Sequence, residues 1–197
     1  MPQRLPKSRL MLCMLASLLA QPALAADDPE PEAEPEEWNV SQPPGEWQTI
    51  TIDTDETTWS NVDVSPDGST IVFDMLGDIF TVPIAGGEAT ALTHGIEWNY
   101  QPRYSPDGSR IVLVSDRGGG DNLWIMDADG SDPRAVTDES EHLVHNPAWS
   151  PDGEYLVAKK SFMSTRSIAA GEIWLFHAGH EGGGLQLTER PHDDDDQ

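Results

Sequence analysis

Cysteine and basic residues are scarce in this chain. Its 197 residues include one cysteine, Cys13, near the N-terminus, so the remainder can form neither a disulfide nor a thiolate site. Eleven lysines and arginines face 35 acidic residues, which gives a formal charge of −24. Nucleic acid and anionic membrane surfaces attract clustered basic residues, so the charge argues against both as partners. The apolar run Leu10–Ala20 is too short for a membrane span.

The first 25 residues have the features of a secretory signal peptide. Arg4, Lys7 and Arg9 precede the apolar run, and Ala23-Leu24-Ala25 provides a small-x-small cleavage pattern. Leu12 stands where a lipoprotein needs a small residue before its cysteine, so lipidation is disfavoured. Cleavage after Ala25 removes Cys13 and leaves eight basic residues against 35 acidic ones. We therefore expect a periplasmic or secreted protein.

Two acidic segments flank the centre of the chain. Residues 26–46 include the proline-rich stretch Asp27–Glu37, which cannot bury apolar surface and predicts a disordered linker. Residues 191–197 form an acidic tail, in which Asp193–Asp196 is either a calcium site or a solvated charge run. Four adjacent carboxylates at a chain end favour the solvated alternative.

The tetrapeptide Ser-Pro-Asp-Gly occurs three times, at 65–68, 105–108 and 150–153. The copies are 40 and 45 residues apart, a spacing typical of β-propeller blades. Serine first, proline second and glycine last are the preferences of a tight turn between antiparallel strands. Each copy is followed by an apolar strand, a second strand, a glycine-bearing turn and a short segment that ends in Thr93, Thr137 or Thr188.

These elements predict an all-β fold, an incomplete β-propeller of three four-stranded antiparallel blades. We place the blades at 59–97, 98–141 and 142–190. Residues 47–53 alternate in polarity, and the segment 47–58 is predicted to form an N-terminal strand that would close the last blade of a complete ring. Propellers use four to eight blades. Three blades cannot close, so the sequence is expected to be the first part of a larger protein.

Blade topology indicates where a ligand or partner would bind. Chain reversals place the Ser-Pro-Asp-Gly and glycine-rich turns at one end of the blades. The second-to-third connections and the inter-blade connections share the other end. The second set is irregular, and binding residues concentrate in such loops. The candidates on this face are Trp98, Asn99, Tyr100, Asp116, Arg117, Asp121, His142, His145 and Arg166.

A search for catalytic motifs assigns no catalytic residue and no metal ligand. The segment 116–121 is glycine-rich but lacks the ending of a phosphate loop. The segment 127–132 begins like a calcium loop but aligns with a hairpin turn. Neither His142 with His145 nor His177 with His180 has the His-Glu-x-x-His arrangement, and no Gly-x-Ser-x-Gly elbow occurs. Three of five recurring tryptophans occupy repeat positions, which favours packing between blades over ligand stacking.

The turns, the run at 121–131 and the closing threonines resemble the repeats of the periplasmic TolB family. A closer likeness, over about residues 38–192, is to the N-terminal propeller of exported bacterial amidohydrolases, and it is carried by segments 59–67, 74–78, 83–89 and 170–174. This resemblance implies a downstream barrel that holds a divalent metal such as zinc and hydrolyses amide bonds. None of the barrel residues lies in this sequence.

Three functions remain open from the sequence. The leading one is a non-catalytic propeller segment of a metal-dependent amidohydrolase, whose partners are the rest of the propeller and a downstream catalytic domain. The second is a stand-alone periplasmic propeller that binds a protein partner. The third is the N-terminal propeller of a prolyl-oligopeptidase-type serine peptidase. None of the three requires a cofactor in this chain.

Overall fold

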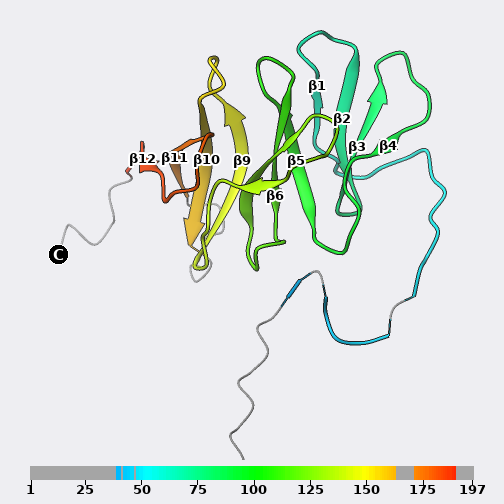
Figure 1. The fold of residues 1–197 in the computed structure, drawn as a ribbon, viewed down its shortest axis with the longest axis horizontal. Helices are drawn as coiled ribbons and strands as arrows, with labels where there is room; N and C mark the ends of the chain where they lie inside the picture. The colour runs from blue at the N-terminus through cyan, green and yellow to red at the C-terminus, as the bar shows by residue number, and fades with distance from the viewer. Residues whose placement is uncertain (1–38, 41, 47, 163–170, 190–197) are drawn as a thin grey trace, which may run out of the picture. The chain divides into compact units, whose positions relative to one another are not determined.

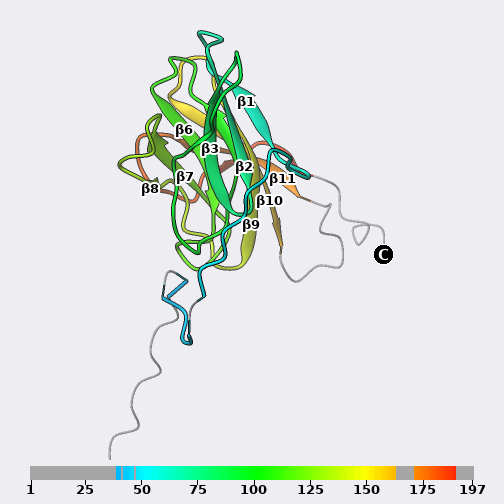
Figure 2. The ribbon, with the colours of Figure 1, turned by 90° about the vertical axis from the view of Figure 1, so that its right-hand side faces the viewer.

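The structure, a computed structural model, describes residues 39–40, 42–46, 48–162 and 171–189. The signal peptide, the acidic tail and Arg166, all predicted from sequence, lie outside these residues. The described residues form twelve strands and no helix. The strands make three four-stranded antiparallel sheets, each in sequence order (Figure 1, Figure 2). The predicted all-β fold with three antiparallel blades is confirmed.

Each sheet is one blade and begins with its inner strand. Blade 1 contains β1 (Val62–Val64), β2 (Thr70–Met75), β3 (Asp78–Pro83) and β4 (Thr90–Ala91). Blade 2 contains β5 (Asn99–Tyr104), β6 (Arg110–Ser115), β7 (Asn122–Asp127) and β8 (Arg134–Ala135). Blade 3 contains β9 (His142–Trp149), β10 (Tyr155–Phe162), β11 (Glu172–His177) and β12 (Leu185–Gln186). Blade 2 lies between the other two, because β5 packs on blade 1 and β9 packs on blade 2.

Hydrogen bonds within each Ser-Pro-Asp-Gly turn explain why the tetrapeptide recurs. In blade 2 the Ser105 hydroxyl donates to Asp107 Oδ1 at 2.6 Å and accepts from the Arg110 amide at 2.9 Å. Gly108 donates its amide to the Ser105 carbonyl and has a φ of 73°, a conformation in which only glycine is unstrained. The serine–aspartate bond and the positive-φ glycine recur in the other two turns.

The turn aspartates give the fold an acid-sensitive component. The Ser105 hydroxyl, with further hydrogen bonds from Ser109, lowers the pKa of Asp107 from 3.8 to about 2. A pKa that is depressed in the folded state contributes stability above the unfolded value, and this stability is lost as pH falls through the folded value. We therefore expect denaturant midpoints to fall between about pH 4 and pH 2, and to fall less steeply in Asp107→Asn. If the denaturant midpoint falls equally steeply with pH in both proteins, the Asp107 turn is not the cause of the acid sensitivity.

The closing threonine of each blade fastens the outer strand to the third strand. Thr137 donates its hydroxyl to Asn122 Oδ1 at 2.7 Å and accepts from the Leu123 amide at 2.9 Å. Thr93 and Thr188 make the equivalent pair of bonds in their blades. The side chain thus replaces ladder bonds, and each outer strand ends two residues before its threonine.

Thr137→Val tests this fastening at a buried site. The substitution keeps the shape but leaves the Leu123 amide without its acceptor, so we expect a loss of about 1–3 kcal/mol in the free energy of unfolding. The matched variant Thr188→Val lies at an exposed site and should cost about 0.5 kcal/mol or less, because water replaces the lost bonds. Chemical denaturation of both variants measures the difference, and equal losses would contradict the assignment.

The hydrophobic core consists of two clusters, one at each junction between blades. At the blade 1–2 junction, Ile111 and Leu113 of β6 pack with Val72 and Ile79. The alternate β6 residues Val112 and Val114 pack at the blade 2–3 junction, with Leu123, Leu156 and Phe176 among others. The β6 strand is therefore apolar on both faces, as in a sheet buried on both sides.

Three tryptophans pack at these junctions, as predicted from their repeat positions. Trp124 packs at the blade 1–2 junction, and Trp149 and Trp174 pack at the blade 2–3 junction. Trp149 also donates its indole N–H to the Arg103 carbonyl of the preceding blade at 3.1 Å. Trp59 and Trp98, in contrast, are 96% and 55% exposed.

Several strand limits differ from the sequence expectation. The inner strands β5 and β9 begin earlier than expected, so Asn99, Tyr100, His142 and His145 lie on strands, not in loops. Each of these strands continues past a bulge, at Gln101-Pro102 and at Asn146-Pro147, where two residues oppose one on the partner strand. The bulge accommodates a proline that cannot donate to the ladder.

The strand limits also differ from the sequence expectation at the end of β10 and in residues 48–60. The β10 strand extends to Phe162, whereas the sequence placed a loop from Lys159 onward. Residues 48–60 form no strand within the described part of the chain. The strand predicted at 47–58 requires a last blade as its pairing partner, so that strand stays a prediction.

Candidate binding face

The two ends of the blades differ as the topology predicts. At one end, each Ser-Pro-Asp-Gly hairpin accepts a hydrogen bond from the turn between the third and fourth strands of its blade. The Ala128 N–H donates to the Ser109 carbonyl, and the Ala178 N–H donates to the Glu154 carbonyl. At the other end, Asn99 N bonds to Gly77 O and Val144 N bonds to Asp121 O. These bonds tie the inter-blade connections to the second-to-third turns. We call this second end the loop face; it comprises residues 76–77, 94–98, 116–121 and 138–141.

Arg117 organises the loop face at the blade 1–2 junction. Its guanidinium donates to Asn99 Oδ1 at 2.8 Å and lies 3.6 Å from the Glu97 carboxylate. It also lies over the Trp124 ring, 5.0 Å from the ring centroid. Burial lowers the pKa of Arg117, while Glu97 and then Asp116 raise it. These contacts hold a cation in a largely covered position between the two blades.

Exposed apolar side chains lie on the same face as this cation. Trp98 lies against Gly77, where a Cβ would come within 2.9 Å of the indole ring. The Trp98 amide donates to Asp116 Oδ1 at 2.8 Å, which fixes the backbone of the inter-blade connection. Leu76 and Ile96 on the same face are 62% and 40% exposed. Leu76 has a φ of 55°, an unfavourable conformation for leucine that presents its side chain to solvent.

A second group of polar side chains joins two inner strands to Asp121 of the loop face. Asp121 and Tyr100 share a hydrogen bond, and burial is the main cause of the raised pKa of both. Burial also lowers the pKa of His145, with a further contribution from the nearby Lys159. At neutral pH the Tyr100 hydroxyl is therefore a donor and the His145 ring is uncharged.

Three amide side chains at equivalent repeat positions were missed by the sequence analysis. Asn61, Gln101 and Asn146 each lie four residues before the serine of a Ser-Pro-Asp-Gly turn. Gln101 exchanges two hydrogen bonds with Asn146, of 2.9 and 2.6 Å. The Asp74 carboxylate accepts hydrogen bonds from the backbone N–H of Gln101 and from the side-chain amide of Asn61. The recurrence of an amide at this position was the signal that could have found them.

The blade 2–3 junction has its own charged group. Glu139 lies 2.5 Å from Lys160 Nζ and 3.0 Å from His142 Nδ1. Lys160 also lies over the Trp174 ring, 4.2 Å from its centroid. His142 is therefore held by a carboxylate. Among the described residues, no three His, Cys, Asp or Glu side chains gather as a metal site.

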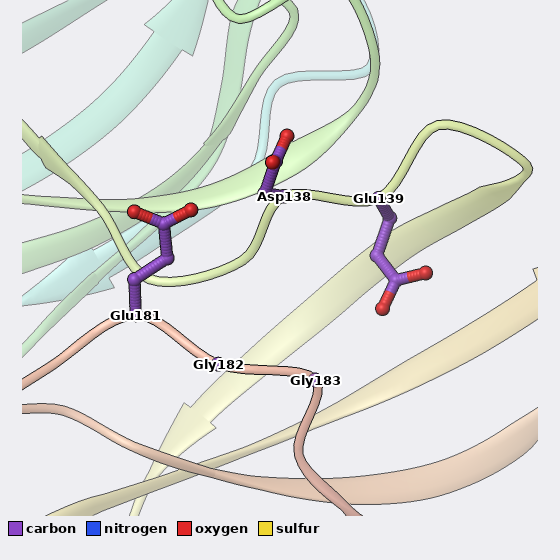
Figure 3. A pocket seen from close by; sticks show the side chains of 5 residues that line it. All are labelled: Asp138, Glu139, Glu181, Gly182 and Gly183. Atoms are coloured by element: carbon purple, nitrogen blue, oxygen red, sulfur yellow. The ribbon is translucent and has the colours of Figure 1, made fainter.

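A hollow of about 210 Å³ lies beside Glu139. Figure 3 shows the side chains of Asp138, Glu139 and Glu181 around it, with Gly182 and Gly183 along one wall. It forms because Gly182 donates its amide to the Val136 carbonyl, which draws the long turn of blade 3 against the outer edge of blade 2. The lining charges are all negative, and Glu139 already has two partners.

The structure brings together most of the predicted candidates but gives them different roles. Trp98 is exposed on the loop face, and Asp116 and Arg117 support it. Asn99 is fully buried and holds Arg117. Tyr100 and His145 of the inner strands form a separate group with Asp121 of the loop face. The loop face thus carries exposed apolar side chains together with the largely covered Arg117 cation.

Four-stranded antiparallel sheets that pack side by side through repeating junctions define a β-propeller. A family model of the TolB β-propeller domain matches residues 56–177, and this chain belongs to that family. The described part of the chain contains no helix long and apolar enough to cross a membrane.

Individual relatives match only part of the chain. The uncharacterized peptidase YuxL of Bacillus subtilis is 39% identical over 87 residues, which are 44% of this chain and 12% of that protein. The uncharacterized protein Atu1656 of Agrobacterium fabrum is 38% identical over 97 residues, 47% of this chain and 33% of that protein. The chain thus spans a third or less of these two relatives.

Among solved structures, a putative TolB from Agrobacterium tumefaciens superposes with a TM-score of 0.59 at 26% identity. The match covers 68% of this chain and 50% of that one. TolB from Acinetobacter baumannii superposes with a TM-score of 0.56 at 19% identity, over 68% and 33% of the two chains. The second likeness concerns the fold alone.

Proposed function

We propose that this chain is a non-catalytic propeller segment of an exported protein, and that the whole protein is a metal-dependent amidohydrolase. In that protein the propeller flanks or gates a downstream catalytic barrel, which holds a divalent metal such as zinc. The signal-like residues 1–25 support export to the periplasm or medium. We assign the hydrolytic step to that barrel.

The observation that carries this proposal is the apolar surface at both ends of the blade array. Val64 of blade 1 is 46% exposed and Leu187 of blade 3 is 50% exposed, on faces that point away from blade 2. Such faces are covered by further blades in a complete propeller. The match to half of the Agrobacterium tumefaciens chain supports the same conclusion.

We further propose that the loop face is the recognition surface, with Trp98 as its central contact. A half-exposed tryptophan beside a charged group is typical of residues that dominate binding energy. In the whole protein, Trp98→Ala should weaken the association between the propeller and its catalytic domain or protein partner. If Trp98→Ala leaves this association unchanged, the loop face is not the recognition surface.

Two alternatives have specific support. The similarity to YuxL, described as a peptidase, favours a serine peptidase with an N-terminal propeller. The match to the TolB domain favours a stand-alone propeller that binds a protein partner.

Reading the DNA beyond codon 197 in every frame separates the three. We expect further blades and then a His-x-His motif that opens a barrel. A stop codon after three or four more blades would replace the proposal with the binding propeller. A Gly-x-Ser-x-Gly elbow would replace it with the serine peptidase.

A further inference from the structure

The three tryptophans at the blade junctions share a feature that Trp98 lacks. A basic side chain lies over each of their rings, at 5.0, 4.9 and 4.2 Å from the ring centroids: Arg117 over Trp124, Arg110 over Trp149 and Lys160 over Trp174. An indole ring attracts a cation to its face, because its π electrons make that face negative. Each junction tryptophan therefore has a cation supplied by the chain itself.

Trp98 is held at the surface without such a cation. No basic side chain in the described part of the chain lies over its ring. The indole rests against Gly77, and the residue is 55% exposed. The hydrogen bond from the Trp98 amide to Asp116 Oδ1 fixes the backbone from which the ring projects. The ring is thus available to a cation from outside the chain.

Two apolar side chains extend the surface next to this ring. Leu76 directly precedes Gly77, which the indole contacts, and Ile96 lies two residues before Trp98. Both are exposed, as noted above for the loop face. Exposed apolar side chains that gather within a polar surface mark an interaction site. A segment that binds here would place apolar residues beside its cation.

The charged side chains of the loop face are almost all acidic. Arg117 is its one lysine or arginine, and it has six acidic residues: Glu97, Asp116, Asp121, Asp138, Glu139 and Glu141. Arg117 pairs with Glu97, and Lys160 of β10 pairs with Glu139. Among the described residues, no lysine or arginine pairs with the other four carboxylates. A basic partner would therefore meet unneutralised negative charge around the exposed indole.

The acidic residues at the opposite end of the blades are engaged within their own turns. Four of them accept a hydrogen bond from a serine hydroxyl of the same turn: Asp67, Asp107, Asp129 and Asp152. Neither of the two exposed tryptophans, Trp59 and Trp98, lies in these turns. The combination of an exposed indole, apolar neighbours and unpaired carboxylates belongs to the loop face.

We propose that the loop face binds a basic peptide segment, in which an arginine or lysine lies over the Trp98 ring. Apolar residues next to this cation contact Leu76 and Ile96. Asp116, which is bonded to the Trp98 amide, supplies a carboxylate near the bound cation, and the other unpaired carboxylates attract the segment from a distance. The partner thus provides at Trp98 what the chain provides at its three junction tryptophans.

Selection from a displayed library of random twelve-residue peptides on the full chain tests the proposal without assuming a sequence. Peptides that bind the parent but not Trp98→Ala should contain an arginine or lysine next to a leucine, isoleucine or aromatic residue. Predominantly acidic or uncharged peptides would overturn the proposal. A selection that yields no peptide whose binding depends on Trp98 would overturn it as well.

The tightest selected peptide then allows a matched comparison by fluorescence anisotropy. In its counterpart, citrulline replaces arginine or acetyl-lysine replaces lysine, which removes the charge and changes the shape little. The charged peptide should bind the chain about fivefold more tightly or better, the size of a cation–π contact that is partly shielded from water. Equal affinities of the two peptides would overturn the proposal.

Substitutions in the chain locate this preference for the charged peptide. Trp98→Leu keeps an apolar side chain but removes the indole, and should reduce the preference to about twofold or less. Asp116→Asn keeps an oxygen that accepts from the Trp98 amide, and should reduce it about two- to threefold. The control Asp132→Asn removes the same charge at the opposite end of the blades and should leave the preference unchanged. A preference that persists in Trp98→Leu, or falls no more in Asp116→Asn than in Asp132→Asn, would overturn the proposal.

This inference rests on the proposed recognition role of the loop face and adds the charge of the segment that it recognises. The two can fail separately. If Trp98→Ala weakens the binding of charged and uncharged peptides equally, the loop face is still a recognition surface and only the basic partner is wrong. If Trp98→Ala weakens neither, both are wrong.

Discussion

Gly130→Ala is expected to destabilise the fold by about 3 kcal/mol. Gly130 has a φ of 89°, and a Cβ there would lie 2.5 Å from the Leu92 carbonyl oxygen of the preceding blade. A positive φ alone costs an alanine about 1 kcal/mol. Overpacking against a backbone atom adds about 1–3 kcal/mol, because the turn or the strand must move.

Gly119→Ala is the matched control for this prediction. Gly119 has a similar φ of 96°, but a Cβ there would meet no atom within 4 Å. It should therefore cost only about 1 kcal/mol, the conformational part. The difference in the free energy of unfolding between the two variants measures the blade 1–2 contact. A difference below about 0.5 kcal/mol would mean that the turn of blade 2 does not lie against Leu92.

Arg117→Ala is expected to cost about 2–3 kcal/mol in the free energy of unfolding. It leaves Asn99 Oδ1, on a fully buried residue, without its donor. It also leaves Glu97 without its cation in a position where the carboxylate side chain is only 14% exposed. Removing one partner of a buried ion pair costs about 3–5 kcal/mol, and partial solvent access reduces this.

Arg117→Lys separates charge from geometry at the same site. Lysine keeps the positive charge but lacks the planar fork that reaches both Asn99 and Glu97, so we expect a loss between those of the parent and Arg117→Ala. Denaturant unfolding gives the energies, and tryptophan fluorescence reports on the tryptophans as a group, including Trp124, over whose ring Arg117 lies. Full stability in Arg117→Ala would contradict the role given to this cluster.

The sequence was sufficient to predict features that depend on local spacing. The Ser-Pro-Asp-Gly turns set the blades, their strand order and the two distinct ends, because each turn fixes a hairpin by its own hydrogen bonds. The packing of Trp124, Trp149 and Trp174 followed from their repeat positions. These features depend on residues close in the chain or on exact repetition of a pattern.

Side-chain contacts between residues far apart in the sequence could not be predicted. Arg117 meets Asn99 and Glu97 only because β5 and β6 pair and the inter-blade connection folds back over them. Gln101 meets Asn146, 45 residues away, through bulges at these positions. The repeated amide and the following proline mark the two positions in the sequence, but not their hydrogen bond to each other. Asn99 was a binding candidate from its loop-like surroundings, yet it is buried because β5 begins there.

Our central proposal is that this chain is a propeller segment that recognises a partner and that the hydrolytic step belongs to a catalytic domain outside it, and an amidase assay tests it most directly. Purified chain is incubated with zinc and amide or peptide substrates, with and without a chelator. We predict no turnover above the zinc-only control under either condition. Turnover that the chelator abolishes would contradict the account and would place a metal-dependent active site within these 197 residues.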